Sequence, residues 1–288
     1  MPEWKIIRPM PPLGEAERRV LLESETEQPN SGIYENFYEN GMYLCRQCGL
    51  SLFRSESKFG CECGWPAFDD SIPDAVEKRA DPDGVRTEIV CANCCGHLGH
   101  YFEGENFTSG NRRHCVNSLS ISHIPSLKAI FAGGCFWGVE DIFRNVPGVL
   151  LVTPGYSGGH TVSPTYREVC EGKTGCIESV LIDYDRDATD YRMLLHFFFE
   201  IHDPTQIDRQ GPDTGLQYRS VVFYFDKEQK RIARETIDKL RSLGIEAATR
   251  VEPVRSFYPA EDYHRRYFEK HPEGRVQTCH VRKPIDWN

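Results

Sequence analysis

Two arrangements of cysteine in this sequence could carry chemistry. The first is a single cysteine within Gly133-Gly134-Cys135-Phe136-Trp137-Gly138, and the second is a pair of Cys-x-x-Cys motifs in the first hundred residues. A thiolate is both a nucleophile and a soft metal ligand. The isolated cysteine therefore indicates a reactive nucleophile, and the paired cysteines indicate a metal site or a redox pair.

Cys135 lies where a predicted strand passes into a predicted helix. Residues 128–132 form an apolar run, and apolar residues then recur at helical spacing (Val139, Ile142, Phe143 and Val146). Backbone N–H groups and the dipole at a helix start favour negative charge, so we expect the pKa of the Cys135 thiol to be lowered. By position alone, an inert buried cysteine fits equally well.

The paired cysteines are Cys45 with Cys48 and Cys91 with Cys94. Two such pairs supply four soft ligands for a tetrahedral metal, which favours one structural zinc ion over a disulfide. The segment between the pairs is longer than in a compact zinc ribbon, so the fold has to bring them together.

Other reactive residues surround these pairs in the sequence. Arg113 precedes Cys115 by two positions, so on a strand it shares the same face and could stabilise a thiolate. His97 and His100 could donate protons near neutral pH. Cys63 begins a Cys-Gly-Trp-Pro turn. The histidines alone would be assigned a structural role, but this combination favours a reaction site.

Composition restricts the class of protein. A net charge of −9 argues against nucleic acid or an anionic membrane as a partner, and no apolar run is long enough to span a membrane. The first residues lack the apolar core of a signal peptide. Twelve cysteines at paired spacing suit metal or redox chemistry in a reducing compartment, so we expect a cytoplasmic protein.

The pattern of elements predicts two domains that position these residues. Residues 1–122 contain a short helix at 15–22 and then short β-like segments separated by Gly and Pro turns (43–44, 52–53, 85–90, 98–102 and 116–121), which predicts an all-β domain stapled by zinc. Residues 123–127 form a predicted linker that contains Pro125. Residues 128–288 alternate strands (128–132, 178–184 and 219–225) with helices (191–202 and 227–243), which predicts an α/β or α+β domain.

Residues 13–122 resemble a B-type methionine sulfoxide reductase. The resemblance covers Gly32-Ile33-Tyr34, both zinc pairs, Cys63-Gly64-Trp65-Pro66-Ala67-Phe68, His97-Leu98-Gly99-His100 and Arg113-His114-Cys115-Val116-Asn117-Ser118. It implies that Cys115 attacks the sulfoxide sulfur and that Cys63 resolves the sulfenic acid. It further implies that Trp65 lines the methyl pocket and that four residues shape the proton-donating site (His97, His100, Arg113 and Asn117). Cys95 and an extra cysteine, Cys61, depart from the family pattern, and Cys61 could compete with Cys63.

Residues 128–280 resemble an A-type methionine sulfoxide reductase. The resemblance is carried by Gly134-Cys135-Phe136-Trp137-Gly138, Gly155-Tyr156-Ser157-Gly158-Gly159, Pro164 to Cys170, Thr174-Gly175-Cys176-Ile177-Glu178, His202-Asp203-Pro204, Arg209 to Asp213 and Gln217-Tyr218-Arg219-Ser220. It implies that Cys135 is the nucleophile, that Glu178 is the acid, and that Phe136 and Trp137 cradle the methyl group. Three more residues would bond around the oxygen (Tyr166, Asp213 and Tyr218). Cys176 stands where the family usually has histidine.

Together the two resemblances imply a bifunctional peptide-methionine sulfoxide reductase. The first domain would reduce the R epimer and the second the S epimer of methionine sulfoxide, free or in proteins, because each enzyme type acts on one epimer. A buried carboxylic acid such as Glu178 has a raised pKa and can protonate the departing oxygen. Thioredoxin as the external reductant follows from the resemblance alone.

Two other classes of protein remain as alternatives at this stage. A zinc-dependent binding module with an inert second domain would keep its function when cysteines outside the zinc site are replaced. A general thiol–disulfide oxidoreductase would carry a surface Cys-x-x-Cys at a helix start, whereas both pairs here are better used by a metal.

The resolving thiol of the second domain is the weakest part of the resemblance. A-type enzymes commonly place it two residues after the glycine of Asn-Pro-x-Gly, whereas this chain reads His271-Pro272-Glu273-Gly274 and has its cysteine at Cys279. Cys176 competes because it lies two residues from Glu178. We favour Cys279 because a C-terminal tail can meet the roughly 7 Å limit between disulfide Cα atoms more readily than a strand residue. Cys61 is less suited, and so is Cys170, whose apolar neighbours place it in the core.

We therefore predict a Cys135–Cys279 crosslink after one equivalent of the S-sulfoxide without reductant, detected by peptide mapping. A Cys135–Cys176 crosslink would contradict the assignment. So would a Cys279→Ser variant that retains full thioredoxin-driven turnover.

Overall fold

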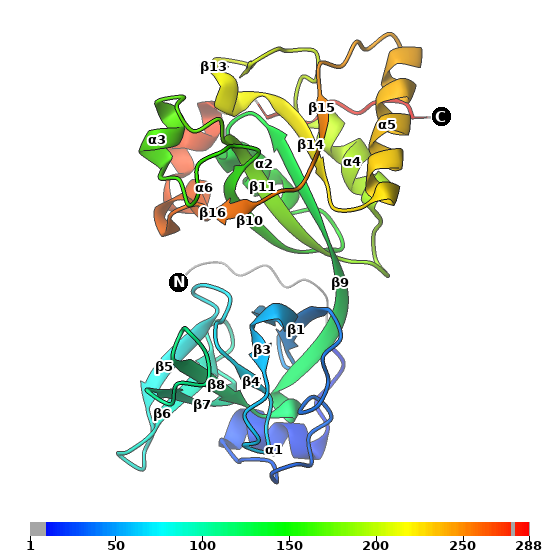
Figure 1. Cartoon of the computed structure of the whole chain (residues 1–288). Helices are drawn as coiled ribbons and strands as arrows, with labels where there is room; N and C mark the ends of the chain where they lie inside the picture. The colour runs from blue at the N-terminus through cyan, green and yellow to red at the C-terminus, as the bar shows by residue number, and fades with distance from the viewer. Residues whose placement is uncertain (1–9, 278–279, 288) are drawn as a thin grey trace. The chain divides into compact units, whose positions relative to one another are not determined.

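The computed structural model describes residues 10–277 and 280–287, and the chain divides into two compact units, Met1–Ser126 and Leu127–Asn288 (Figure 1). The first unit is mostly β-structure and the second mixes helices with a sheet, as the sequence predicts. Among the described residues, no helix has both the length and the apolar character needed to cross a membrane.

The first unit contains one helix and two small sheets. Its elements are α1 (Glu15–Glu23), β1 (Gly41–Cys45), β2 (Ser51–Arg54), η1 (Ser55–Ser57), β3 (Lys58–Phe59), β4 (Ala67–Phe68), β5 (Val76–Ala80), β6 (Thr87–Cys91), β7 (His97–Glu103), β8 (Arg112–Val116), η2 (Ser118–Ser120) and the start of β9 (Ile121–Gly133). One sheet has β1 between β2 and β9, and the other has the order β3-β4-β8-β7-β6-β5.

Aromatic side chains pack the two sheets of the first unit together. Phe53 of β2 stacks on Phe68 of β4 with ring centroids 4.4 Å apart, and Tyr43 of β1 meets Phe68 edge-on at 5.0 Å. All three rings are fully buried. Each buries a large apolar area, so this aromatic cluster accounts for much of the stability of a small unit.

The strand predicted over residues 116–121 is wrong. β8 ends at Val116, and residues Ser118–Ser120 form a 3-10 turn. The buried carboxylate of Glu27 accepts hydrogen bonds from the backbone N–H groups of Ser118 (2.6 Å) and Leu119 (3.1 Å). These two N–H groups therefore bond to one side chain instead of to a neighbouring strand. The strand pairing of β8 stops before them for this reason.

The predicted linker belongs to a strand. Residues 123–127 lie inside β9, and Pro125 pairs with Gly41 at the end of the ladder with β1. Farther along β9, Ile130 to Gly133 pair with β14. Proline lacks only the backbone N–H that would donate a hydrogen bond to the neighbouring strand. It is therefore tolerated where the pairing of two strands ends.

The second unit is built on a six-stranded sheet. After β9 come α2 (Phe136–Phe143), β10 (Val149–Ser157), α3 (Tyr166–Cys170), β11 (Ile177–Asp185), α4 (Tyr191–Glu200), β12 (Arg209–Gln210), β13 (Asp213–Thr214), η3 (Leu216–Tyr218), β14 (Ser220–Tyr224), α5 (Lys227–Ser242), β15 (Arg250–Pro253), β16 (Phe257–Pro259), η4 (Asp262–His264), α6 (Tyr267–Lys270) and η5 (Pro272–Gln277). The sheet order is β15-β14-β9-β11-β10-β16.

Strand alternation divides the buried residues of this sheet between its two faces. Ala129 and Phe131 of β9 join the main core with α2, α4 and α5, while Ile130 and Ala132 join a smaller cluster. The main core thus lies between the sheet and these three helices, which can be followed in Figure 1. The sequence also predicted the start of α5 correctly, because Asp226 accepts a hydrogen bond from the Gln229 N–H at 2.8 Å.

Candidate active sites and metal centre

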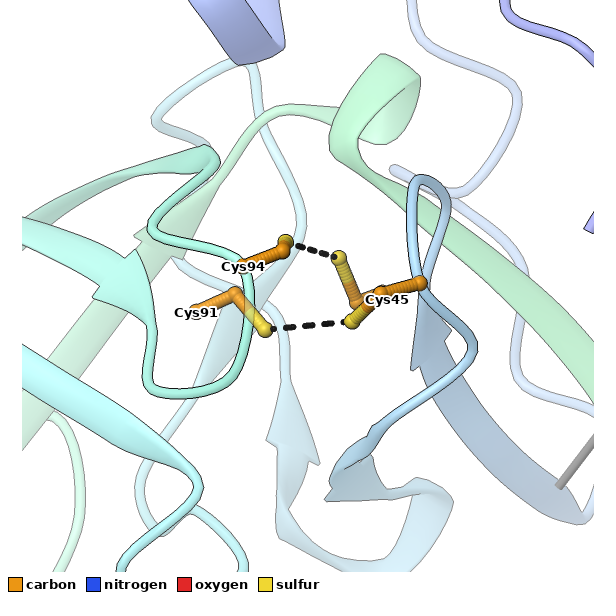
Figure 2. Close-up of side chains that lie close together, drawn as sticks. Cys45, Cys91 and Cys94 are labelled. Carbon is orange, nitrogen blue, oxygen red and sulfur yellow. Dashed lines mark hydrogen bonds between the residues drawn. The ribbon is translucent and has the colours of Figure 1, made fainter. Parts of the chain in front are cut away.

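Four cysteines of the first unit converge on one point. The sulfurs of Cys45, Cys48, Cys91 and Cys94 all lie within 4.8 Å of one another. The Cys45–Cys94 and Cys48–Cys91 sulfur pairs are each 3.6 Å apart, and dashed lines mark both contacts in Figure 2. Cys45 ends β1 and Cys91 ends β6, so the cluster joins the two sheets of the unit.

The two cysteine pairs adopt the same backbone turn. Gly49 N–H donates to Cys45 O at 2.8 Å, and Cys95 N–H donates to Cys91 O at the same distance. Gly49 and Cys95 both have positive φ, +75° and +60°. Cys95 therefore occupies in the second turn the left-handed position that glycine takes in the first. Its side chain is exposed and lies outside the cluster of four.

The donor set suits zinc. Tetrahedral zinc–thiolate bonds of about 2.3 Å place the sulfurs about 3.8 Å apart, close to the measured 3.6 Å contacts. Soft thiolates select zinc over magnesium or calcium. Four thiols this close could not all lose their protons without a cation between them, because like charges repel strongly when buried.

Cys115 lies in the six-stranded sheet of the same unit. On β8 it pairs with Ala67 of β4 on one side and with His100 of β7 on the other. Its sulfur is 4.0 Å from the sulfur of Cys63, which comes from the turn between β3 and β4. The fold therefore brings these two predicted reactive thiols into contact.

Arg113 acts on the Cys115 thiol against a larger effect of burial. Burial raises the pKa of Cys115 to about 11, while the charge of Arg113 and its hydrogen bond to the sulfur lower it. The guanidinium is itself held by two bonds to the carboxylate of Glu105, at 2.7 and 2.8 Å. In this state, the thiol is protonated at neutral pH, with a fixed cation ready to stabilise the thiolate.

The two predicted proton donors each lie in short contact with a carboxylate. His97 Nδ1 lies 2.6 Å from a Glu88 oxygen, and His100 Nε2 lies 2.6 Å from an Asp81 oxygen. The imidazole rings meet edge-on at 5.5 Å. Burial lowers the pKa of His97, and Glu88 opposes that shift. His97 Nε2 is buried and has no hydrogen-bond partner among the described residues, so it is available to an oxygen atom of a ligand.

Glu27, which the sequence did not point out, connects the remaining predicted residues. Trp65 Nε1 donates to Glu27 O at 3.1 Å, and Glu27 N–H donates to the Asn117 side-chain oxygen at 3.0 Å. Asn117 also donates to Leu98 O, so its amide is fully oriented. A single glutamate in a polar loop gave no signal, because its partners lie far away in the sequence.

Cys61 and Cys63 are joined by a disulfide, with their Cα atoms 5.3 Å apart. The intervening Glu62 has φ +52° and is exposed, as is Gly60. The sulfur of Cys63 therefore lies near two other sulfurs, that of its bonded partner and that of Cys115.

In the second unit, Cys135 is the N-cap of α2, directly after β9, as predicted. Gly134 before it has φ +99°, and a Cβ there would lie 2.6 Å from Gln210, so only glycine fits this approach. The predicted lowering of the Cys135 pKa is wrong. Burial and Glu178 raise it well above the usual value, although the N–H groups of Trp137 and Gly138 act in the opposite direction. The helix start lowers the pKa less than loss of water raises it.

Glu178, on β11, is buried beside this thiol. Its oxygen accepts a hydrogen bond from the Phe136 N–H at 3.0 Å. Burial raises the pKa of Glu178 to about 8, the hydrogen bond lowers it, and Asp213 raises it further. The carboxyl group is thus protonated at neutral pH, which agrees with the sequence-based expectation of an acid.

The other predicted polar residues surround Cys135 and Glu178. Tyr166 begins α3, Asp213 lies on β13 and Tyr218 ends η3. Burial and the nearby Glu178 raise the pKa values of both tyrosines, and Cys135 and Asp213 add to the effect on Tyr218. Burial raises the pKa of Asp213. Five residues from five different elements therefore influence one another electrostatically (Cys135, Tyr166, Glu178, Asp213 and Tyr218).

Aromatic residues form one wall of this site, and the structure adds His264 to it. Trp137 Nε1 donates to His264 Nδ1 at 2.9 Å, and the His264 ring lies 5.0 Å from Phe136 and 4.4 Å from Tyr166. Glu261 accepts a bond from the Tyr166 N–H at 2.8 Å. The acidic and histidine cluster Glu261-Asp262-Tyr263-His264 was the available sequence signal.

The three candidate resolving cysteines of the second unit have different surroundings. Cys279 lies outside the described residues. Cys176 is buried in the core, while Cys170, which we predicted to be a core residue, is exposed at the end of α3 and hydrogen-bonded with Tyr166. The prediction for Cys170 was wrong because it relied on apolar neighbours in the sequence, whereas α3 directs this last residue outward.

The second unit places a thiol beside a buried acid. The first unit has a thiol site of its own and, in addition, a cluster of four cysteines. This combination is typical of a two-domain, thiol-dependent reductase. Residues 127–286 match the family Peptide methionine sulfoxide reductase, and residues 13–125 match the SelR domain. The chain therefore belongs to the peptide methionine sulfoxide reductases, and carries a B-type domain followed by an A-type domain.

Individual proteins agree with this family assignment. The chain is 52% identical over 145 residues to the peptide methionine sulfoxide reductase MsrA of Acinetobacter baumannii (strain AYE), covering 50% of this chain and 84% of that protein. It is 47% identical over 161 residues to that of Natronomonas pharaonis, covering 55% and 90%. The crystal structure of reduced Mxr1 from Saccharomyces cerevisiae matches with 33% identity and a TM-score of 0.52, over 55% of this chain and 92% of that one.

The raised pKa of Glu178 predicts how the stability of the second unit changes with pH. The native carboxyl keeps its proton up to about pH 8, whereas the unfolded carboxyl loses it near 4.5. The native state therefore binds more protons between these values, and stability falls as pH rises. Relative to Glu178→Gln, the unmodified protein should lose about 1.4 kcal/mol per pH unit between roughly pH 5 and 8. Amide hydrogen exchange of β11, followed by mass spectrometry, measures this difference.

Glu171→Gln, at an exposed position in the same unit, is the matched control and should leave the pH dependence unchanged. An equal pH dependence in Glu178→Gln and the unmodified protein would contradict the raised pKa.

Proposed function

We propose that Cys115 reduces the R epimer and Cys135 the S epimer of methionine sulfoxide in this bifunctional reductase. The observation that carries the proposal is the pairing of each thiol with a proton source: Cys135 with the buried Glu178, and Cys115 with the His97 and His100 neighbourhood. A sulfoxide requires both a soft nucleophile at sulfur and a proton at the departing oxygen.

In the second unit, the protons balance within the site. Cys135 gives up its thiol proton as its sulfur attacks the sulfoxide sulfur, and Glu178 protonates the sulfoxide oxygen. The hydroxyl group then passes to the Cys135 sulfur, while its bond to the substrate sulfur and the new bond between the two sulfurs both break. The thiol proton restores Glu178, and the products are methionine and a Cys135 sulfenic acid. Glu178 raises the pKa of Cys135, and Asp213 raises that of Glu178, because like negative charges repel strongly where water is scarce. Each proton is therefore retained until substrate binds.

Phe136 and Trp137 would hold the methyl group of the substrate, and Tyr166, Tyr218 and Asp213 would bind its oxygen or the released water. The aromatic wall supports this role because His264 fixes the Trp137 ring through a hydrogen bond. Orientation of the methyl group against this wall selects one configuration at sulfur.

In the first unit, Cys115 would form a sulfenic acid in the same way, with Arg113 stabilising the attacking thiolate. His100 or His97 would deliver the proton, with Trp65 at the methyl pocket and Asn117 beside it. Cys63 then condenses with the sulfenic acid, forming a Cys63–Cys115 disulfide and water. The 4.0 Å contact between these sulfurs supports this step.

A dithiol protein of the thioredoxin class would reduce the resulting disulfides, since the cycle needs two electrons from outside. In the second unit, Cys279 remains the proposed resolving thiol. A reducing compartment such as the cytoplasm suits a chain that needs its free thiols and four metal-binding thiolates kept reduced.

The first unit would hold one structural zinc ion through Cys45, Cys48, Cys91 and Cys94. The ion would neutralise the thiolates and tie the ends of β1 and β6 together. It takes no part in sulfoxide reduction, since Cys115 lies on a different strand.

Replacing one zinc ligand should destabilise only the first unit. Cys94→Ser is expected to lose the metal and to lower the melting temperature of this unit by about 10 °C or more, while S-epimer turnover is nearly unchanged. Elemental analysis and calorimetry measure these effects. The control is Cys95→Ser, whose side chain lies outside the cluster and should keep the metal. Absence of metal from freshly purified, reduced protein would contradict the assignment.

Single replacements of the nucleophiles should separate the two activities. Cys115→Ser is expected to lose R-epimer reduction by more than about 10³-fold and to keep S-epimer reduction, and Cys135→Ser should do the reverse. A serine hydroxyl is a much poorer nucleophile toward sulfur than a thiolate. Turnover on each separated epimer is the measurement. Loss of both activities in either variant, with an unchanged circular dichroism spectrum, would contradict two independent sites.

A further inference from the structure

We propose that Cys61 is a third working thiol of the first unit, which takes the disulfide away from Cys115 and presents it to the external reductant as Cys61–Cys63. This inference rests on the proposed role of Cys115 as nucleophile and extends its reaction cycle by one step.

The contacts of Cys63 carry the argument. Its sulfur is bonded to Cys61 and lies 4.0 Å from the sulfur of Cys115. One sulfur thus lies within reach of two possible disulfide partners, one on the strand and one in the turn. In the structure, Cys61 is joined to Cys63 and Cys115 is a free thiol.

The transfer would move the disulfide to a part of the chain that an external reductant can reach more easily. Cys115 and Cys61 are both partly exposed, but Cys115 lies on a strand with neighbours on both sides. Cys61 lies in the turn between β3 and β4, with exposed residues, Gly60 and Glu62, on either side. A protein reductant must bring its own thiol in line with a disulfide sulfur. The turn is therefore the better place for it to attack.

The chemistry balances without any additional oxidant. The sulfenic acid of Cys115 and the thiol of Cys63 give the Cys63–Cys115 disulfide and water. The Cys61 thiolate then attacks the Cys63 sulfur, the bond to Cys115 breaks, and Cys115 leaves as a thiolate that takes up the proton lost by Cys61. Arg113 stabilises this leaving thiolate. A thioredoxin-class dithiol finally reduces Cys61–Cys63 and supplies the two electrons.

The Cα atoms of Cys61 and Cys63 are 5.3 Å apart, within the range that disulfides span. Only one residue separates the two thiols, so Cys61 attacks at a high effective concentration.

The test begins with fully reduced full-length protein and one equivalent of free methionine R-sulfoxide, without reductant. After acid quenching and alkylation, peptide mapping should find the Cys61–Cys63 disulfide within one peptide and an alkylated Cys115. Cys61→Ser should instead trap the Cys63–Cys115 disulfide, form methionine in the first turnover as fast as the unmodified chain, and lose thioredoxin-driven turnover by about fivefold or more.

Glu62→Gln is the matched control, because it changes the same turn but keeps both thiols, and it should behave as the unmodified chain. Cys63–Cys115 as the dominant disulfide of the unmodified chain would overturn the inference, as would undiminished steady-state turnover in Cys61→Ser. Cys115→Ser tests the proposed function separately: if this variant still yields methionine, Cys115 is not the nucleophile, and the third-thiol role falls with it.

Discussion

The burial of Glu178 beside Cys135 is the constraint on which the second unit depends. Burial raises the pKa of both groups, and Glu178 raises that of Cys135 further. The free protein therefore holds two protons at the site, where the proposed reaction would use them. Phe136 and Trp137, proposed to hold the methyl group of the substrate, are apolar and would also help to keep water out.

The first unit meets the same chemical demand with different means. Near Cys115 it has a fixed guanidinium from Arg113 and two histidines held by short contacts to carboxylates. The buried carboxylate of Glu27 slightly raises the pKa of this thiol. Arg113 only partly offsets the effect of burial on the pKa of Cys115, so the thiols of both units stay protonated at neutral pH. Under the proposed assignment, two different arrangements would serve one reaction at opposite configurations of sulfur.

The four-cysteine cluster is separate from both sites, and its position indicates what it does. The first unit has only a short helix and two small sheets, joined by a few aromatic rings such as Phe53 and Phe68. A metal that ties the ends of β1 and β6 would supplement a core of this size. The two cysteine turns share one backbone conformation, so each presents its pair of sulfurs in the same way.

The sequence by itself determined the properties that depend on neighbours along the chain. The spacing of the cysteine pairs gave the ligand set, Asp226 gave the start of α5, and the motifs around Cys115 and Cys135 gave the family and the residues now proposed for catalysis. Local geometry decides these features, because turns, caps and ligand pairs are made by residues a few positions apart.

Only the tertiary structure decided the features that depend on distant contacts. Glu27 ends β8 from about 90 positions away in the chain, and Cys170 is exposed where its sequence neighbours suggested burial. The pKa of Cys135 is set by a competition between the helix N-terminus and the loss of water, which sequence cannot weigh. The approach of the Cys115 sulfur to the Cys61–Cys63 pair was likewise decided by the tertiary structure. Loss of water around a group and contacts between distant residues arise only once the chain has folded, so the sequence alone does not reveal them.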